Sequence, residues 1–409
     1  MAAAEVIVIG GGPAGLGAAT ELARTGRHVL VLEREAEAGG IPRHCGHYPF
    51  GMREFHRVLR GPDYAAQLVK TARAAGVTIR NRTTVTALRP HGEVEITDDA
   101  GPALLTAKAV LLATGVRETS RAARLIGGEK PGGIVSTGAL QGMVYLNRQQ
   151  PFRQPVILGS EMVAFSALLT CRHAGIKPLA MIETGPRITA RRPAHWLASV
   201  MGVQIHLHSD VIAIHGRTRV DGVSLATPYG PKDLPADGVI VSGGFRPDAT
   251  LLRASHLEVD HGSGGPVIDR WGRLSDPAYF AAGNLLRGVE TAGWCWAEGR
   301  RTAGAILAAL AGRLPDPGGT RISLGHPALR LALPQVIGTG PADRPERRSD
   351  FVHSRLQIRL QCPAKGQLRL MQGGRILAST RIDSLPERRL SLPLKAVSGL
   401  GGPLTLTIE

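Results

Sequence analysis

The chain has 409 residues, of which 43% are hydrophobic, and this is enough for two or three domains with buried cores. Its formal net charge is +16, but the basic residues are spread along the chain and only 4% of residues are aromatic, so the composition does not favour a nucleic-acid-binding protein. No apolar run reaches the ~18 residues of a membrane helix, and the first strand begins too early for a cleavable signal peptide. We therefore expect a soluble, cytoplasmic protein without a transmembrane segment.

The four cysteines, Cys45, Cys171, Cys295 and Cys362, lie far apart in the sequence, and none belongs to a C-x-x-C pair. This spacing argues against a disulfide framework, a zinc site and a cysteine-ligated iron–sulfur cluster. We therefore predict no metal site.

Residues 6–33 predict a βαβ unit that binds a dinucleotide. An apolar strand at 6–9 runs into Gly10-x-Gly12-x-x-Gly15, an alanine-rich helix follows, and a second apolar strand ends at Glu33. In this motif the first glycine permits a tight turn, the second lets a pyrophosphate approach the backbone, and the third lets helix and strand pack closely. The free N–H groups and the dipole at the helix start favour the negative pyrophosphate. Glu33 is placed to accept hydrogen bonds from an adenosine ribose.

A similar unit begins with the apolar strand at 155–158, continues through a turn at Gly159 and a helix, and ends with a strand at 178–182 followed by Glu183. The rest of the first 311 residues alternates between short strands and helices. The predicted elements are a helix at 63–75 with Asp63 as its N-cap, strands at 77–80, 83–88, 93–97, 109–113, 203–207, 211–214, 220–226, 238–241 and 277–282, and a helix at 291–311.

From about residue 349 the pattern changes to short alternating strands separated by glycine and proline. These strands are predicted at 356–360, 367–371, 376–381, 389–392 and 404–408. The sequence thus predicts an α/β fold with two Rossmann-like, three-layer dinucleotide-binding domains and a small C-terminal all-β appendage.

The order of motifs over roughly residues 5–312 resembles the flavoproteins of the glutathione reductase type, in the pyridine nucleotide-disulfide oxidoreductase superfamily. The matching motifs are residues 6–33, Ala113-Thr114-Gly115, the second unit, and Gly283-Asn284 with the helix that follows. A narrower set is similar to small FAD oxidoreductases associated with glycerol-3-phosphate dehydrogenases, and to the FAD subunits of opine oxidases and hydrogen cyanide synthase. This set comprises Gly39-Gly40-Ile41, Cys45-x-His47, Phe50-Gly51 and Gly61-Pro62-x-Tyr64-Ala65.

This resemblance implies FAD as the cofactor and a discontinuous first domain. The implied domains are 1–117 with 265–314 for FAD, 118–264 as a degenerate NAD-like domain, and 345–409 as the C-terminal β domain. Asn284 stands where the family has an aspartate that bonds the ribitol, and Thr291 would start a helix that faces the flavin. The implied FAD contacts are Gly10, Gly12, Pro13, Ala14, Gly15, Glu33, Gly40, Ile41, Thr114, Gly115, Gly283, Asn284, Thr291 and Ala292.

The second unit departs from the family pattern, because Glu161 occupies the position of the middle glycine. A carboxylate ~4 Å from a phosphate costs about 4 kcal/mol at an effective dielectric near 20, which weakens binding roughly a thousandfold. We therefore expect no nicotinamide nucleotide in the usual pose, unless Glu161 turns to solvent. Glu183 is interpreted as the solvated end of a strand.

The candidate catalytic residues are His47 and Cys45, which follow the Gly39-Gly40 turn that lies beside the flavin ring in the family. A histidine, whose ordinary pKa is about 6.5, can remove a substrate proton while hydride passes to flavin N5. A cysteine beside a histidine can be a thiolate of lowered pKa. The alternative is that this loop only encloses the cofactor.

We interpret the chain as an FAD-dependent oxidoreductase, a dehydrogenase that takes hydride from a small organic donor. It would act alone or as one subunit of a heteromeric dehydrogenase, with a quinone or another non-nicotinamide acceptor. Two alternatives stay open: an NAD(P)H-dependent flavoprotein reductase, which Glu161 disfavours, and a non-catalytic FAD-bearing subunit that relays electrons.

Overall fold

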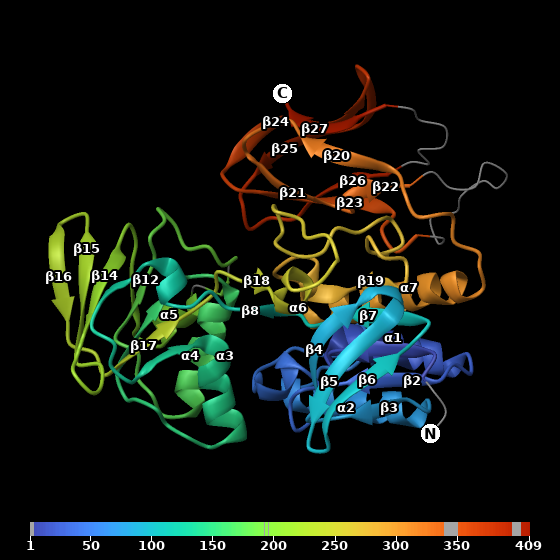
Figure 1. The fold of residues 1–409 in the computed structure, drawn as a ribbon. Coiled ribbons are helices and arrows are strands. Elements are labelled where there is room, and N and C mark those ends of the chain that lie inside the picture. The colour runs from blue at the N-terminus through green and yellow to red at the C-terminus, as the bar shows by residue number, and fades with distance from the viewer. Residues whose placement is uncertain (1–3, 192, 195, 339–350, 395–401) are drawn as a thin grey trace. The chain divides into compact units, whose positions relative to one another are not determined.

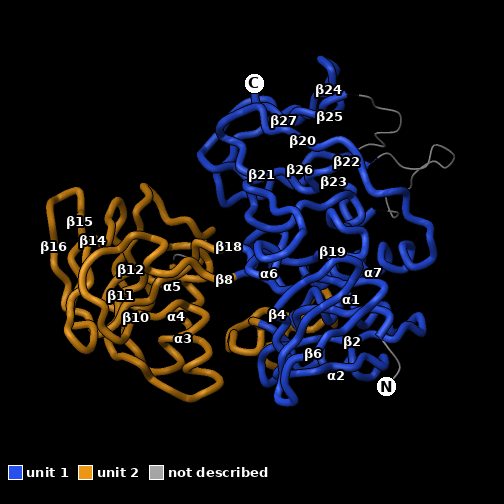
Figure 2. Tube along the Cα trace, in the orientation of Figure 1, with its two compact units in different colours: residues 1–40, 65–116, 247–409 blue, residues 41–64, 117–246 orange. Residues whose placement is uncertain are grey.

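The protein is described from a computed structural model, which defines residues 4–191, 193–194, 196–338, 351–394 and 402–409 (Figure 1). These residues form two compact units (Figure 2). Unit 1 comprises residues 1–40, 65–116 and 247–409, and unit 2 comprises residues 41–64 and 117–246. The sequence instead assigned 41–64 to the first domain. The expected limits of independently folding domains stay a prediction.

A five-stranded parallel sheet with the order β19-β7-β1-β2-β3 is the centre of unit 1. Its strands are β1 (Val6–Ile9), β2 (Val29–Leu32), β3 (Thr78–Arg80), β7 (Ala109–Leu112) and β19 (Tyr279–Ala281). All residues of β1, β7 and β19 are buried, which is why these strands read as continuous apolar runs. Val6 aligns with Val29 on one side and with Ala109 on the other.

The sheet of unit 1 is covered on both faces. An antiparallel meander covers one face, and its Val85 and Ile96 share a core with Ile7 and Ile9 of the sheet. Its strands are β4 (Thr84–Arg89), β5 (Glu93–Asp98) and β6 (Gly101–Thr106). Helices α1 (Pro13–Arg24) and α7 (Ala292–Leu310) pack against each other as a further layer (Figure 1). Helix α2 (Gly61–Ala74) and the short α6 (Thr250–Arg253) complete the helices.

Helix α2 begins at Gly61, so Asp63 lies in its first turn and is not the N-cap that the sequence predicted. Pro62 occupies the first turn as well, where its missing N–H leaves no hydrogen bond unmade. After its first excursion through residues 41–64, the chain leaves unit 1 again at β8 (Val116–Arg117) and returns at β18 (Arg246–Pro247).

Unit 2 repeats the architecture of unit 1, with a five-stranded parallel sheet in the order β10-β17-β11-β12-β13. Three antiparallel strands and the edge strand β9 (Gly127–Gly128) form a second sheet. The strands of the parallel sheet are β10 (Ile134–Ser136), β11 (Pro155–Leu158), β12 (Ala180–Ile182), β13 (Gln204–His206) and β17 (Gly238–Val241). The antiparallel strands are β14 (Asp210–His215), β15 (Gly222–Thr227) and β16 (Gly230–Leu234), and the helices are α3 (Thr137–Gln141), α4 (Met162–His173) and α5 (Trp196–Val200).

Two sheets at the C-terminus enclose one apolar core and form what we call the C-terminal β sandwich. The sheets have the orders β22-β20-β27-β24-β25 and β21-β23-β26. The strands are β20 (Thr320–Leu324), β21 (Leu329–Leu333), β22 (Val336–Ile337), β23 (Arg355–Leu360), β24 (Ala364–Gln372), β25 (Arg375–Ser384), β26 (Leu390–Pro393) and β27 (Leu404–Ile408). The sandwich therefore starts before the expected residue 345, which lies outside the described residues.

The predicted fold class is confirmed, since two Rossmann-like units and a C-terminal all-β part are present. Among the described residues, no helix combines the length and the apolar character that crossing a bilayer requires.

The contact between α1 and α7 gives a test of this packing. A Cβ at Gly299 would overlap the carbonyl oxygen of Ala14, whereas a Cβ at Gly304 on the same helix would meet no atom within 4 Å. We expect Gly299→Ala to lower the free energy of unfolding by about 1–3 kcal/mol through overpacking. Gly304→Ala should raise it by about 0.5–1 kcal/mol, because alanine favours the helix. Urea unfolding measures both, and equal effects would contradict the packing described.

Candidate functional site

The glycine turn after β1 is built by close backbone contacts in unit 1. Gly10 has φ +107°, and a Cβ there would lie 2.5 Å from the carbonyl oxygen of Ala113. A Cβ at Gly15 would overlap the carbonyl oxygen of Gly10. Gly12 is different, since its Cβ would meet only the Cα of Gly40, at 3.9 Å. The backbone at Gly12 is therefore open, as a site for a pyrophosphate requires.

Helix α1 starts at Pro13 and Ala14, and its N-cap, Gly12, offers no side-chain hydrogen bond to the first N–H groups. These donors are left for an anion, which the helix dipole also favours. Gly40 closes the turn from the other side, since its Cβ would lie 2.8 Å from the Cα of Gly12. Ile41 is the first residue of unit 2 and is 55% exposed.

Glu33 lies at the end of β2 and is buried, with 7% of its surface exposed. Its Oε2 accepts a hydrogen bond from the Gly11 N–H at 2.9 Å, and its Oε1 accepts one from the Glu35 N–H at 3.0 Å. These bonds fix the carboxylate beside the glycine turn. Because each carboxylate oxygen has a second lone pair, both can still accept from ribose hydroxyls.

Thr114 and Gly115 follow β7 and connect to a distant segment of unit 1. The Thr114 hydroxyl donates to the carbonyl oxygen of Asp248 at 3.0 Å, and the Asp248 N–H donates to the Gly115 carbonyl at 2.9 Å. The Thr114 hydroxyl is thus engaged in holding the turn.

Gly283 places the C-terminal part of the predicted FAD site, residues 283–292, beside the glycine turn at the start of α1. A Cβ at Gly283 would lie 2.8 Å from the Cβ of Ala14, so only glycine allows this approach to the start of α1. The Gly283 N–H donates to Oε2 of Glu298 at 2.8 Å. Asn284 spans the loop, since its Oδ1 accepts from the Glu290 N–H at 2.7 Å and its Nδ2 donates to the Glu290 carbonyl at 3.2 Å.

Thr291 is the N-cap of α7, and its side chain makes no capping bond, so the N–H groups at Ala292 and beyond are open to an anionic group. With the exception of Ile41, the residues that the sequence predicted for FAD all lie in unit 1. The open backbone at Gly12, the two helix starts without side-chain caps and the fixed carboxylate of Glu33 fit a dinucleotide such as FAD. The individual contacts of these residues with FAD stay a prediction.

The corresponding crevice of unit 2 is filled by Glu161. A Cβ at Gly159 would lie 2.6 Å from Oε2 of Glu161, and one at Gly243 would overlap Oε1, so the carboxylate lies between the two turns. The Ser242 hydroxyl donates to Glu161 at 2.6 Å. Burial raises the pKa of the Glu161 carboxyl above its usual range, although the Ser242 hydrogen bond opposes this. Glu161 therefore turns inward and not to solvent.

Glu183 is buried and hydrogen-bonded, so its interpretation as a solvated strand end is wrong. Its Oε2 accepts from the Ser160 hydroxyl, and its Oε1 accepts from the Gly185 N–H at 2.8 Å. The position of Glu183 in unit 2 matches that of Glu33 in unit 1. In unit 2, however, a serine hydroxyl donates a hydrogen bond to the carboxylate. The sequence offered no sign of this bond, because Ser160 precedes Glu183 by 23 residues.

Cys45 lies in unit 2 as a buried thiol. Its Sγ–H donates to Oε1 of Gln141 at 3.4 Å, and the Gln141 amide donates to the Ser166 hydroxyl at 2.8 Å. Burial raises the pKa of Cys45 to about 12, and the charge of Glu118 adds to the effect. The lowered pKa considered from the sequence is therefore wrong, and the thiol is protonated.

His47 is partly exposed on the same loop, with Nδ1 3.1 Å from the Tyr48 carbonyl oxygen and its ring 5.5 Å from that of Phe50. Its catalytic role stays a prediction. All four cysteines lie in the described part of the chain and are free, so no redox disulfide is formed there. The described residues also contain no cluster of metal-ligating side chains.

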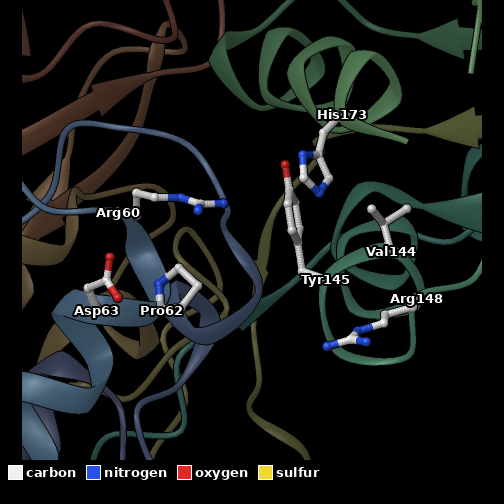
Figure 3. A pocket seen from close by; sticks show the side chains of 7 residues that line it. All are labelled: Arg60, Pro62, Asp63, Val144, Tyr145, Arg148 and His173. Carbon is white, nitrogen blue, oxygen red and sulfur yellow. The ribbon is translucent and has the colours of Figure 1, made fainter. Parts of the chain in front are cut away.

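A cavity of about 260 Å³ adjoins this loop within unit 2 (Figure 3). Arg60 enters it while its Nε donates to the Gly46 carbonyl at 3.1 Å, and the rings of Tyr145 and His173 stack at 4.9 Å. Two guanidinium groups make the cavity suitable for a small carboxylate. No local pattern predicts this cavity, because its lining comes from separate elements. The lining residues are Arg60, Pro62, Asp63, Val144, Tyr145, Arg148 and His173.

Comparison with known proteins gives one family. The model of the pyridine nucleotide-disulphide oxidoreductase family matches residues 4–299. An opine oxidase subunit of Rhizobium meliloti (strain 1021) is 27% identical over 372 residues, which are 83% of this chain and 79% of that protein. The glutamate synthase (NADPH) small chain of Escherichia coli (strain K12) is 26% identical over 341 residues, which are 74% of this chain and 68% of that protein.

Among solved structures, the thioredoxin reductase of T. acidophilum has a TM-score of 0.65 at 22% identity. The match covers 76% of this chain and 100% of that chain, and it shows the common fold.

The predicted cradle can be tested with two glycines. Gly12→Ala adds a methyl group with room on the protein side, so we expect normal stability but FAD affinity reduced about tenfold or more. In Gly15→Ala the added methyl group overlaps the Gly10 carbonyl oxygen, so we expect both the stability and the FAD affinity to decrease. FAD titration of the apoprotein and urea unfolding separate the two effects. Wild-type affinity in the Gly12 variant would contradict the cradle.

His353 predicts a pH dependence of stability. It is 2% exposed, and burial lowers its pKa to about 4, against the opposing charge of Glu298. Between pH 4 and 6.5 the unfolded chain binds a proton at this position and the folded protein does not, so the free energy of unfolding decreases as pH falls through this window. His353→Gln should remove this part of the slope in urea unfolding at pH 4.5–7. An unchanged slope would show that His353 does not contribute.

Proposed function

Since the chain belongs to the pyridine nucleotide-disulphide oxidoreductase family and is an FAD-dependent oxidoreductase, we propose that it oxidises a small organic donor and passes the electrons to a non-nicotinamide acceptor. The observation that carries this proposal is the inward position of Glu161. The dinucleotide crevice of unit 2 is already filled by a carboxylate held by Ser242, whereas the crevice of unit 1 is open at Gly12.

The charges at the crevice of unit 2 oppose a nucleotide in two further ways. Glu118 accepts hydrogen bonds from the N–H groups of Gly138 and Gly243, at 2.7 and 3.1 Å. These two N–H groups are therefore not open to an anionic ligand. The carboxylates of Glu118 and Glu161 both lie near Gly243, and their repulsion of a phosphate supports the proposal that the acceptor is not a nicotinamide nucleotide.

Bound FAD would supply the hydride acceptor for this oxidation. In the proposed reaction His47 removes the proton that leaves the donor's hydroxyl or amine group. Cys45 remains a thiol, and its hydrogen bond to Gln141 fixes the loop that carries His47. A disulfide substrate is disfavoured, since a protonated and buried Cys45 has no partner cysteine to exchange with among the described residues.

The cavity beside this loop supports a donor that carries a carboxylate. Arg60 and Arg148 can hold a carboxylate, and Asp63 can hold an ammonium or hydroxyl group of the same molecule. Amino acids, their N-alkylated derivatives and hydroxy acids have this chemistry. One relative is named as part of an opine oxidase, which supports a heteromeric enzyme of this class.

An NADPH-dependent reductase is the second candidate, because another relative is named as an NADPH enzyme. A non-catalytic FAD-bearing subunit would show no turnover when isolated. These two candidate functions differ from the proposed one in whether NADPH, or a small organic donor, reduces the flavin.

Anaerobic reduction of the flavin tests the proposal. Neither NADH nor NADPH should reduce the flavin of the purified protein within minutes, whereas dithionite should, and at least one carboxylate-bearing donor from a panel should bleach the flavin band. Glu161→Gln removes the charge at nearly constant size, and Glu161→Gly also empties the crevice. We expect NADPH affinity to rise in that order, by up to roughly a thousandfold. Fast reduction of the wild-type flavin by either nucleotide would establish the reductase instead.

A further inference from the structure

A buried ionic cluster joins the C-terminal β sandwich to the loop that precedes α7. Glu290 is 5% exposed and stands directly before Thr291, the N-cap of α7. Its Oε1 lies 2.9 Å from Nη2 of Arg359, and its Oε2 is bonded by Nη2 of Arg389. Both arginines belong to the sandwich, at β23 and at the residue before β26.

The two arginines are cross-strand neighbours. Strands β23 and β26 are antiparallel, and Ile358 pairs with Leu390, so Arg359 and Arg389 come next to each other in this register. Like charges in such positions repel. Glu290 is the anion that compensates both, so the position of this pair is explained by a residue outside the sandwich.

The same cluster extends to the predicted flavin contacts. The backbone N–H and carbonyl of Glu290 are both bonded by the Asn284 side chain. On the other side Arg287 makes two hydrogen bonds to Glu298, at 2.9 and 3.1 Å, and Glu298 accepts from the Gly283 N–H. Glu290 therefore lies at the point where the sandwich meets the loop from Gly283 to Thr291.

We propose that Arg359 and Arg389 are positioning residues for FAD, which act through Glu290 by fixing the loop 283–291 and the open start of α7. Docking of the sandwich and binding of FAD are then coupled, so each stabilises the other by the same factor. This proposal depends on the predicted place of Gly283, Asn284 and Thr291 at the cofactor. It does not depend on the donor or on the acceptor.

Other contacts hold the sandwich in place, so single substitutions can report on the coupling. The Arg270 guanidinium lies 3.3 Å from the centre of the Phe351 ring, and Trp271 packs on the same ring at 5.4 Å. The His353 N–H donates to the Arg270 carbonyl at 3.0 Å. None of these contacts involves Glu290.

The first test is FAD titration of the apoprotein. Arg359→Met and Arg389→Met should each weaken FAD binding about tenfold or more. The matched control is Arg355→Met on the same strand, whose side chain bonds Ser391 and is exposed, and its affinity should stay within about twofold. Glu290→Gln should weaken binding too, and the loss in the Glu290→Gln/Arg389→Met double variant should be smaller than the two single losses combined. Wild-type affinity in both arginine variants, or fully additive losses, would overturn the proposal.

The second test needs no variant and has no activity readout. Amide hydrogen exchange of the wild-type protein is compared with and without FAD. We expect FAD to slow exchange in the loop 283–291 and also in β23 and β26 of the sandwich. Protection confined to residues 6–40 and 109–115 would overturn the coupling, while flavin reduction experiments would be unaffected by that result.

Discussion

The close approach of three backbone segments at Ala14 is the constraint on which unit 1 depends. Ala14 begins the helix after the first glycine turn, and it is met by Gly283 from one side and by Gly299 of α7 from the other. These segments are far apart in the chain, so their contact closes the discontinuous unit. A larger side chain at Gly299 would separate α7 from α1, and one at Gly283 would push the turn after β19 away from Ala14. The start of α1 therefore packs on α7 and on the turn after β19 only because Gly299 and Gly283 carry no side chain.

The two Rossmann-like units show how one backbone can keep or lose a ligand. In unit 1 the strand-end acid Glu33 is bonded by backbone N–H groups, and the middle glycine leaves the crevice open. In unit 2 the matching acid Glu183 is bonded by the Ser160 hydroxyl, and Glu161 fills the crevice. The parallel sheets have corresponding strand orders. The difference lies in two side chains: the Ser160 hydroxyl donates to the strand-end acid, and the Glu161 carboxylate occupies the crevice.

Much of the fold could be predicted from the sequence, because buried parallel strands are continuous apolar runs. Strands β1 and β11 have the predicted bounds, and the family, the FAD cofactor and the fold class are confirmed. What could not be predicted depends on contacts between distant residues. The prediction that Glu183 is solvated was wrong because its partner is a serine in another turn. The prediction of a lowered pKa for Cys45 was wrong because distant elements bury the thiol. Arg359 and Arg389 are 69 and 99 residues from Glu290, and no local pattern marks such a pair.

The cross-strand arginines also bear on whether the C-terminal β sandwich can exist by itself. Excised from the chain, it would present two adjacent guanidinium groups without the carboxylate that they share, and the remaining protein would keep Glu290 with Arg287, at 3.7 Å, as its nearest described cation. Each piece would thus lose charge partners that the other supplies in the whole chain. Shuffling of this sandwich onto a different catalytic body, or its deletion to obtain a smaller enzyme, would therefore require redesign of both faces.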